Sequence, residues 1–380
     1  MAPGHRMGST ASRWMGRRRE FLAVLALLVL GSTILAAAEG QSSTAKDAHP
    51  AAPQQRTARG QPSLPPRSSI PPCTRYAAAW GSDGSQGSFK RPYRTISKLL
   101  SRLAPGQTGC LRAGLYVENV TLTRGGRPGN PITLTSAPRA RATIRGKFVI
   151  ADGADDIVVT NLNIDGRNTV GATATPIVNG DRSMWLGNDV TSHHTMICFV
   201  IGSAHGRGVA HGTVIARNRI HNCGRLPATN HDHGIYVEAA VGTVIRDNYI
   251  YGNADRGVQL YPNSQNTVVS HNVIDGNGEG VIFSGDGGYA SSGNSVVANI
   301  ISNSTIRANV ESSWSGGGPV GVGNVVARNC LWNGRGGNID ASAGGFVAHG
   351  NIEADPLYVG RFSGDFRLRK HSPCRGKGPR

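Results

Sequence analysis

The densest group of chemically versatile side chains lies in the segment 230–238, which reads Asn-His-Asp-His-Gly-Ile-Tyr-Val-Glu. Two later segments repeat part of this pattern: 255–261 reads Asp-Arg-Gly-Val-Gln-Leu-Tyr, and 279–286 reads Glu-Gly-Val-Ile-Phe-Ser-Gly-Asp. If the three segments are strands of successive coils, equivalent residues lie ~4.8 Å apart. Carboxylates, histidine, arginine and tyrosine would then stand on adjacent strands, and these are the groups that proton-transfer chemistry requires.

The alignment of the three segments predicts a column of carboxylates formed by Asp232, Asp255 and Glu279. Carboxylates this close either raise one another's pKa or share a cation, and such oxygen ligands suit Ca²⁺. Ca²⁺ is therefore the candidate cofactor, with these three residues as its ligands. Two alternatives stay open. Arg256, one residue along, could neutralise the column, or the acids could be turn residues that accept hydrogen bonds from nearby backbone N–H groups.

A second predicted column contains His233 and Arg256, which are the candidate bases, while Tyr236 and Tyr261 are the candidate acids. Elimination at a uronate sugar needs a group that neutralises the carboxylate, a base for the C5 proton and an acid for the leaving oxygen. C5 epimerisation shares the first step and then returns the proton to the opposite face. The alternative for His233 and Arg256 is a solvated or ion-paired face of the coils. The residues predicted to contact the substrate are Glu238, Gln259 and Asp286.

Other sites are less well supported by the sequence. A glycoside hydrolase would use two carboxylates that face each other, ~5 Å apart in retaining enzymes, and Asp232 with Asp255 is the candidate pair. A second polar column is expected to form a surface ladder on another face; its members are Asp165, His221, Tyr251 and Asp275. No histidine or cysteine spacing in the chain is diagnostic of a metal site.

A repeat decides which elements position these residues. Five stretches between 213 and 336 place β-branched residues before an asparagine, and the intervals between these asparagines are 30, 24, 27 and 30 residues. A period of this size predicts stacked coils of strand. Each repeat is predicted to hold two short strands, one before the asparagine and one after a glycine, as at Gly234, Gly257 and Gly280. Apolar residues alternate in the second strand, which indicates one buried face.

The repeated asparagines are interpreted as structural. Asparagine tolerates left-handed backbone at a tight corner, and stacked side-chain amides can bond to the coils above and below. The asparagines interpreted in this way are Asn161, Asn218, Asn248, Asn272, Asn299 and Asn329.

Segments at both ends extend the pattern. The N-terminal pieces are Gly81-Ser-Asp-Gly-Ser, Pro92-Tyr-Arg-Thr-Ile and Leu111-Arg-Ala-Gly-Leu-Tyr, and the tail contains Ala354-Asp-Pro-Leu-Tyr and Gly364-Asp-Phe-Arg-Leu. With the repeats between them, they resemble right-handed parallel β-helix proteins of the pectate-lyase-like superfamily over about residues 75 to 378. The resemblance implies an all-β fold, a single-stranded right-handed parallel β-helix (solenoid). This fold hosts lyases, hydrolases, epimerases and proteins without catalytic activity.

The chain is expected to have three parts. Residues 1–38 are predicted to be an export signal, since arginines precede a short apolar run and a small-residue cleavage site. The motif Arg18-Arg-Glu-Phe-Leu resembles a twin-arginine signal, and an ordinary secretory signal is the alternative. Residues 39–72 are rich in Pro, Ser and Ala and are predicted to be a disordered linker. Residues 73–380 form the β-helix domain, whose open end a short helix over 93–103 is expected to cap.

The cysteine content indicates where the protein is located, and the charge distribution limits which partners it can bind. Six cysteines in an exported chain predict disulfides, and Cys73–Cys110 is the pairing we favour because it would pin the cap. The net charge is +17, yet residues 151–360 carry 11 Lys and Arg against 17 Asp and Glu. A basic groove along the coils is therefore not supported, and no motif indicates nucleic-acid binding.

The sequence thus predicts a secreted, cell-surface or periplasmic monomer with no stable membrane span after signal cleavage. Its expected partner is an extracellular polysaccharide of acidic character. The most concrete function is a uronate-polysaccharide lyase or C5-epimerase. The alternative is a non-catalytic, wall-associated polysaccharide-binding β-helix, and a glycoside hydrolase is third.

Overall fold

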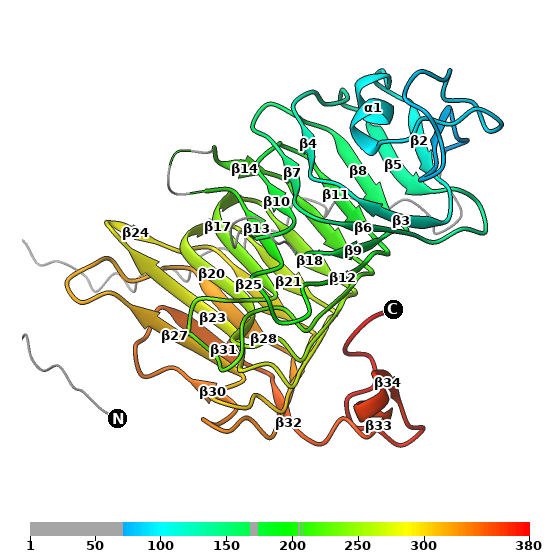
Figure 1. Ribbon diagram of the computed structural model, residues 1–380. Coiled ribbons are helices and arrows are strands. Elements are labelled where there is room, and N and C mark those ends of the chain that lie inside the picture. The colour runs from blue at the N-terminus through cyan, green and yellow to red at the C-terminus, as the bar shows by residue number, and fades with distance from the viewer. Residues whose placement is uncertain (1–70, 168–173, 204–205, 207) are drawn as a thin grey trace, which may run out of the picture. The chain divides into compact units, whose positions relative to one another are not determined.

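Three long parallel β-sheets enclose one hydrophobic core in the computed structural model (Figure 1). The structure describes residues 71–167, 174–203, 206 and 208–380. The predicted export signal and residues 39–70 of the predicted linker lie outside the described residues. Within the described part, strands from successive coils pair in parallel and in register, so the predicted all-β parallel β-helix is confirmed.

The three sheets are named A, B and C. Sheet A consists of β1 (Arg75–Ala77), β2 (Thr108–Leu111), β5 (Ile132–Ser136), β8 (Ile157–Thr160), β11 (Met184–Leu186), β15 (Val214–Ala216), β18 (Val244–Arg246), β21 (Val268–Ser270), β25 (Ser295–Val297), β28 (Asn324–Ala327) and β31 (Phe346–His349). Sheet B consists of β3 (Gly114–Val117), β6 (Ala142–Arg145), β9 (Asn163–Asp165), β12 (Asp189–Thr191), β16 (Arg219–His221), β19 (Tyr249–Tyr251), β22 (Val273–Asp275), β26 (Ile300–Ser302), β29 (Cys330–Trp332) and β32 (Ile352–Glu353).

Sheet C carries the longest strands. It consists of β4 (Val120–Leu122), β7 (Phe148–Ile150), β10 (Ile177–Val178), β13 (Phe199–Ile201), β17 (Ile235–Val241), β20 (Arg256–Gln265), β23 (Glu279–Asp286), β27 (Val310–Trp314) and β30 (Ile339–Asp340), with β14 (Ala210–His211) beside β17 and β24 (Tyr289–Ala290) antiparallel to β23.

Each repeat contains three strands where the sequence predicted two. The run after the repeated asparagine forms its own three-residue strand in sheet B, for example β16 and β19. Such a strand turns only its middle residue inward, as Ile220 and Ile250 do, and both are fully buried. A single apolar residue between two polar ones is too short an alternation to mark a strand in the sequence.

A ladder of asparagine side chains runs along the corner between sheets A and B. The Oδ1 atom of Asn248 accepts hydrogen bonds from the backbone N–H and the side-chain amide of Asn218, at 2.9 and 3.0 Å, and the same pattern repeats from coil to coil. Its members are Asn188, Asn218, Asn248, Asn272, Asn299, Asn329 and Asn351. The structural interpretation of these asparagines is therefore confirmed.

Two details of that interpretation are wrong. The left-handed backbone belongs to the residue before the ladder position, as at Arg217 (φ 59°) and His271 (φ 54°). Asn161 occupies this preceding position too (φ 55°), and in its coil Leu162 stands where the ladder asparagine would be and donates its N–H to Asn188.

A helix covers the N-terminal end of the solenoid, and the C-terminal tail packs on the side formed by sheet B. Helix α1 (Ile96–Ser101) is shorter than the predicted helix, because Thr95 caps its N-terminus and the carboxylate of Glu118 accepts hydrogen bonds from the N–H groups of Ile96 and Ser97. At the other end of the chain, β33 (Tyr358–Gly360), η1 (Arg361–Ser363) and β34 (Asp365–Leu368) pack on sheet B, where Arg361 pairs with Asp275 at 2.7 Å. Among the described residues, no helix has the length and apolar character needed to cross a membrane.

The six cysteines form three disulfides: Cys73–Cys110, Cys198–Cys223 and Cys330–Cys374. The first is the predicted pairing and joins the segment before β1 to β2, under the helical cap. The third fastens the C-terminal tail to β29. The second lies beside the candidate site.

Candidate functional site

The predicted site residues lie on and beside β17, β20 and β23 of sheet C. Val237, Leu260 and Phe283 point into the core, so the residues that alternate with them face outward. In register, Tyr236 lies opposite Gln259, which lies opposite Ile282 and then Glu311 of β27. We call this side of the sheet the site face. Tyr236, Tyr261 and Asp286 reach its surface, whereas Glu238, Gln259, Ile282 and Glu311 are buried beneath it.

Glycines fix where these strands begin. A Cβ added to Gly257 would come within 2.9 Å of the carbonyl oxygen of Gly280, and one added to Gly280 would come within 2.1 Å of the carbonyl oxygen of Asn309. The coils therefore approach at this corner as closely as only glycine allows. The residues immediately before these glycines, Arg256 and Glu279, are placed side by side as a result.

Two tyrosines form the centre of the site face. The rings of Tyr236 and Tyr261 stack with their centroids 6.2 Å apart and their planes at 19°. The hydroxyl of Tyr261 donates a hydrogen bond of 2.8 Å to Asp286. Burial and the Asp286 carboxylate raise the pKa of Tyr261 to about 12, and burial together with Glu238 raises the pKa of Tyr236 above its usual value. Both phenols are therefore protonated at neutral pH, the form that a general acid requires.

His233 lies next to this pair but beneath the surface. Its side chain is 2% exposed, and its ring meets the edge of Tyr236 with the centroids 5.5 Å apart. Burial and the charge of Arg256 hold the pKa of His233 well below its usual range, so the imidazole is neutral. Its Nδ1 atom has no hydrogen-bond partner among the described residues. A neutral imidazole is the form that a base requires, although burial keeps it from the open face.

Arg256 and Glu279 form a buried ion pair. The Nε atom of Arg256 donates to Glu279 Oε2 at 2.9 Å, and both side chains are less than a tenth exposed. The other guanidinium nitrogens donate to the backbone oxygen and the side-chain oxygen of Asn230. Burial raises the pKa of Glu279 to about 8, with Arg256 opposing and Glu311 adding to the effect.

The predicted column of three carboxylates is therefore wrong in its register. Gly257 and Gly280 align, which pairs Glu279 with Arg256 and leaves it one position away from Asp255. Asp255 accepts the backbone N–H groups of Asn230 and Asp232 at 2.9 and 2.7 Å, and Asp232 pairs with Arg225. These two aspartates are turn acceptors, as the alternative interpretation held. No group of three or more His, Cys, Asp or Glu side chains within the described residues is arranged to hold a metal, and the Ca²⁺ site stays a prediction.

A small cavity of about 110 Å³ opens beside the ion pair. We call it the corner pocket; the residues that line it include Ala228, Asn230, Arg256, Glu279, Ile306 and Arg307. Arg307 pairs with Glu311 of the site face at 3.3 Å. Arg307 and Glu311 were not predicted as site residues, because no glycine precedes the strand β27 of their coil. The alternation of Val310 and Ser312 around Glu311 was the signal that could have placed it.

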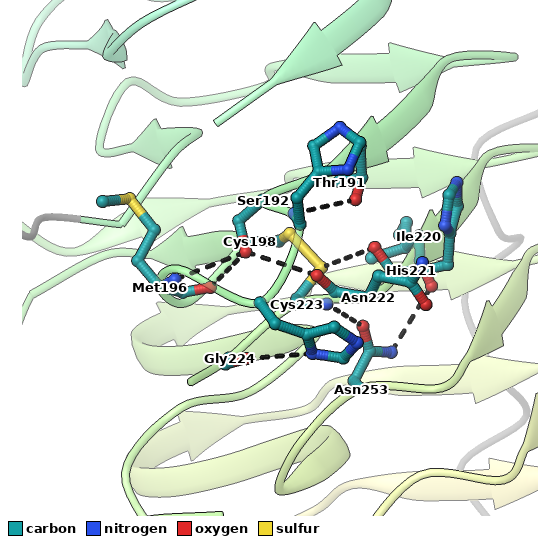
Figure 2. Close-up of a disulfide and its surroundings, with 12 residues drawn as sticks. Thr191, Ser192, Met196, Cys198, Ile220, His221, Asn222, Cys223, Gly224 and Asn253 are labelled. Atoms are coloured by element: carbon teal, nitrogen blue, oxygen red, sulfur yellow. Dashed lines mark hydrogen bonds between the residues drawn. A yellow bond between two sulfur atoms is a disulfide. The ribbon is translucent and has the colours of Figure 1, made fainter. Parts of the chain in front are cut away.

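The loop that supplies Asn230 is fastened at both ends to Cys198. Figure 2 shows the disulfide to Cys223, directly before the loop, together with the hydrogen bond from Cys223 N–H to Asn253. At the other end of the loop, the N–H of Cys198 donates to the carbonyl oxygen of His233 at 3.1 Å. The N–H of Gly224 also donates to Met196 at 2.7 Å. The disulfide thus holds the wall of the corner pocket.

The second polar column exists on sheet B as predicted. Asp165, Thr191, His221, Tyr251 and Asp275 occupy equivalent positions on successive strands. The rings of His221 and Tyr251 stack with a centroid distance of 4.9 Å. At one end of the column Asp165 pairs with Arg145 and Arg167, and at the other Asp275 pairs with the tail, which is typical of a structural ladder.

The family can be assigned from the sequence. Residues 102–333, more than half of the chain, match the family model described as "Periplasmic copper-binding protein (NosD)". The chain belongs to the NosD family. The match begins after helix α1 and ends just beyond β29, so the strands β17, β20 and β23 of the site and the ladder asparagines from Asn188 to Asn329 fall within the NosD region, while Asn351 lies beyond it.

Individual relatives of this NosD-family chain are distant. It is 31% identical over 74 residues to the uncharacterized protein YwoF of Bacillus subtilis (strain 168), a match that covers 20% of this chain and 16% of that protein. The native lacto-N-biosidase (GH136) of Eubacterium ramulus shares the fold, with a TM-score of 0.52 and 13% identity over 74% of this chain and 60% of that one. Pectate lyase Pel9A aligns with a TM-score of 0.48 and 14% identity over 79% and 90% of the two chains.

Proposed function

We propose that this protein is carbohydrate-active and that its ligand is a polysaccharide lying across the site face. The observation that supports this is the stacked pair of Tyr236 and Tyr261, with Asp286 bonded to one phenol. Aromatic rings offer a flat apolar surface to the C–H face of a sugar, while phenols and carboxylates bond its hydroxyls. The three disulfides support an exported protein, where such a polymer is found.

The most concrete form of the proposal is a lyase or C5-epimerase that acts on a uronate polymer. The neutral imidazole of His233 takes the C5 proton, and the electron pair of that C–H bond forms the new double bond as the C4–oxygen bond breaks. A protonated tyrosine, Tyr236 or Tyr261, supplies the proton to the leaving oxygen. In an epimerase, a tyrosine instead returns a proton to C5 from the opposite face. Arg256 is 5% exposed and bonded to Glu279 and Asn230, so it acts on the charge that develops in the substrate through space rather than by contact with the substrate carboxylate.

A second candidate, polysaccharide binding without bond cleavage, is favoured by the burial of the two candidate bases. His233 is 2% exposed, and Arg256 is engaged with Glu279 and Asn230. A glycoside hydrolase remains the third candidate. In the carboxylate pair first considered for it, Asp232 accepts a hydrogen bond from the nearby Arg225 N–H, and Asp255 accepts N–H groups of Asn230 and Asp232 in the preceding coil.

The family description names copper, so the described residues were compared with the needs of that metal. Copper sites use histidine, cysteine and methionine ligands. All six cysteines are in disulfides, and no cluster of three or more His, Cys, Asp or Glu side chains occurs in the part of the chain that the structure describes. The described His, Cys, Asp and Glu side chains therefore do not form a resident copper site, and no step of the proposal uses copper.

The test is incubation of the mature protein with pectate, alginate and glycosaminoglycans while the ultraviolet absorbance of unsaturated uronate products is followed. NMR of the polymer detects epimerisation, and a glycan array detects binding. Cleavage or epimerisation that Tyr236→Phe and Tyr261→Phe reduce supports the enzyme. Binding without turnover supports the second candidate. Neither turnover nor binding on any polymer would exclude the carbohydrate proposal.

A further inference from the structure

The corner pocket contains a buried polar atom whose hydrogen bonding is incomplete. The side chain of Glu279 is 2% exposed, and while its Oε2 atom accepts from Arg256, its Oε1 atom has no hydrogen-bond partner among the described residues. A buried polar atom left without a partner costs about 1–3 kcal/mol, and more when it is charged. A ligand group that entered the pocket beside Oε1 would remove this cost.

The other polar groups of the pocket already have partners. Arg256 is bonded to Glu279 and Asn230, and Arg307 is paired with Glu311. Asp255 accepts two backbone N–H groups. Two arginines therefore face three carboxyl groups, and an anionic ligand gains no net attraction here. The ligand that fits is uncharged and forms hydrogen bonds.

We propose that the corner pocket is a subsite for the hydroxyl-bearing edge of one sugar unit, with Glu279 Oε1 as its hydrogen-bonding partner. A hydroxyl both donates and accepts, so it can bond to a carboxylate, a protonated carboxyl or an unused guanidinium N–H. The volume of about 110 Å³ is that of a few water-sized groups, enough for a ring edge but not for a polymer. Ala228 and Ile306 line the same cavity and supply apolar contact for the C–H groups between the hydroxyls.

The inference rests on the proposed function, since it extends the polysaccharide path from the site face to the corner. Arg256 begins β20 three residues before Gln259, which pairs with Tyr236, so about 10 Å of strand separates the pocket from the tyrosine pair. Glu311 belongs to the site face and also holds Arg307 at the pocket. A chain with one sugar on the tyrosine pair can therefore place another sugar in the corner pocket.

The experiment follows the methyl resonance of Ile306 in full-length protein labelled at isoleucine methyl groups, with Ile306→Val to assign the peak. The probes are methyl β-galactoside and methyl β-glucoside, compared with sodium acetate and inorganic phosphate. We expect at least one glycoside to shift the Ile306 signal saturably. Glu279→Gln and Ala228→Phe should each raise the Kd about tenfold or more, which corresponds to a free-energy change of ~1.4 kcal/mol. The matched control Glu353→Gln alters an exposed carboxylate and should leave the Kd unchanged.

Two results would overturn the subsite. One is no shift of the Ile306 signal with either glycoside up to about 100 mM, a concentration far above millimolar affinity. The other is tighter binding of acetate or phosphate than of the glycosides. The unchanged spectrum of the remaining isoleucine methyl groups shows that each variant is folded. Because the readout needs no polysaccharide, failure here leaves binding at Tyr236 and Tyr261 to be judged separately on the glycan array.

Discussion

Arg256 and Glu279 occupy paired positions on adjacent strands, and their side chains form a buried ion pair of 2.9 Å at the corner of the solenoid. The pair links the two parts of the candidate site. Arg256 begins the strand β20 whose Gln259 pairs with Tyr236 of the site face, and Glu279, which lines the corner pocket, has one oxygen without a partner among the described residues.

Removal of one member of this pair should destabilise the fold more than removal of both. The pKa of about 8 keeps the Glu279 carboxyl largely protonated near pH 7. Arg256→Met leaves this buried carboxyl without its hydrogen-bond donor, which costs ~1–3 kcal/mol, whereas the double variant Arg256→Met/Glu279→Leu leaves no buried polar group from the pair. Thermal unfolding followed by circular dichroism measures the difference. A double variant whose loss in Tm equals the sum of the two single losses would contradict this account of the pair.

The asparagine ladder should tolerate substitution at its end better than at its centre. The side chain of Asn272 is fully buried and bonds to coils on both sides, so Asn272→Ala should cost about 2 kcal/mol or more. Asn351 is half-buried at the last position of the ladder, so Asn351→Ala should reduce the unfolding free energy by a smaller amount. Chemical denaturation of both variants, with the exposed Asn130→Ala as control, checks the order. An equal loss at all three positions would argue against a cooperative ladder.

Asp165 should contribute stability at neutral pH that disappears in acid. Burial alone would raise the pKa of this carboxyl, but hydrogen bonds from Arg167 and Arg145 outweigh it and lower the pKa from 3.8 to about 2. A carboxyl with a lowered folded-state pKa stabilises the fold above its ordinary pKa, and the benefit is lost as pH falls from about 4 through about 2. Asp165→Asn should therefore cost about 2 kcal/mol at pH 7 and little near pH 2. A pH-independent cost would show that the charge is not responsible.

The disulfide Cys198–Cys223 should stabilise both the fold and the corner pocket. It closes a loop of 25 residues, so Cys198→Ser/Cys223→Ser should lower the unfolding free energy by about 3 kcal/mol. Because Asn230 lies in the loop that the disulfide fastens, the Ile306 methyl signal should also shift in the double variant. The equivalent variant at Cys330–Cys374 removes a disulfide of the tail and should leave the Ile306 signal in place. The same Ile306 spectrum in both variants would contradict a link between the disulfide and the pocket.

The fold could be predicted from the sequence because two residue types, asparagine and glycine, recur once per coil at positions where few other residues fit. The buried asparagine ladder requires one side-chain type, and glycines at 257 and 280 are required by close approach of the coils. The strands of sheet B were missed because most of them are only three residues long, which is too short for an alternation of buried and exposed residues to be recognised. Asn188 was missed as a ladder member because no valine or isoleucine pair precedes it; Trp185 and Leu186 stand there instead.

The candidate site was predicted in composition but not in register. The sequence predicted that Tyr236, Tyr261 and Asp286 belong to one site. In the structure the rings of Tyr236 and Tyr261 stack, and the Tyr261 hydroxyl bonds to Asp286. The predicted carboxylate column was misaligned by one residue at Glu279. The prediction aligned the acidic residues with one another, whereas Gly257 and Gly280 set the register of the coils. Burial of His233 could not be predicted either, because it depends on the packing of Tyr236 against its ring.

The most direct test of the central claim is polysaccharide binding by wild-type protein, Tyr236→Ala and Tyr261→Ala on one glycan array, with Phe362→Ala in the tail as the control for loss of an exposed aromatic ring. The account predicts that the wild type and the control bind the same polysaccharide and that each site-face variant loses about tenfold or more in affinity, since an aromatic contact of ~1.5 kcal/mol is removed. Unchanged binding by both site-face variants, or no binding by the wild type, would contradict it.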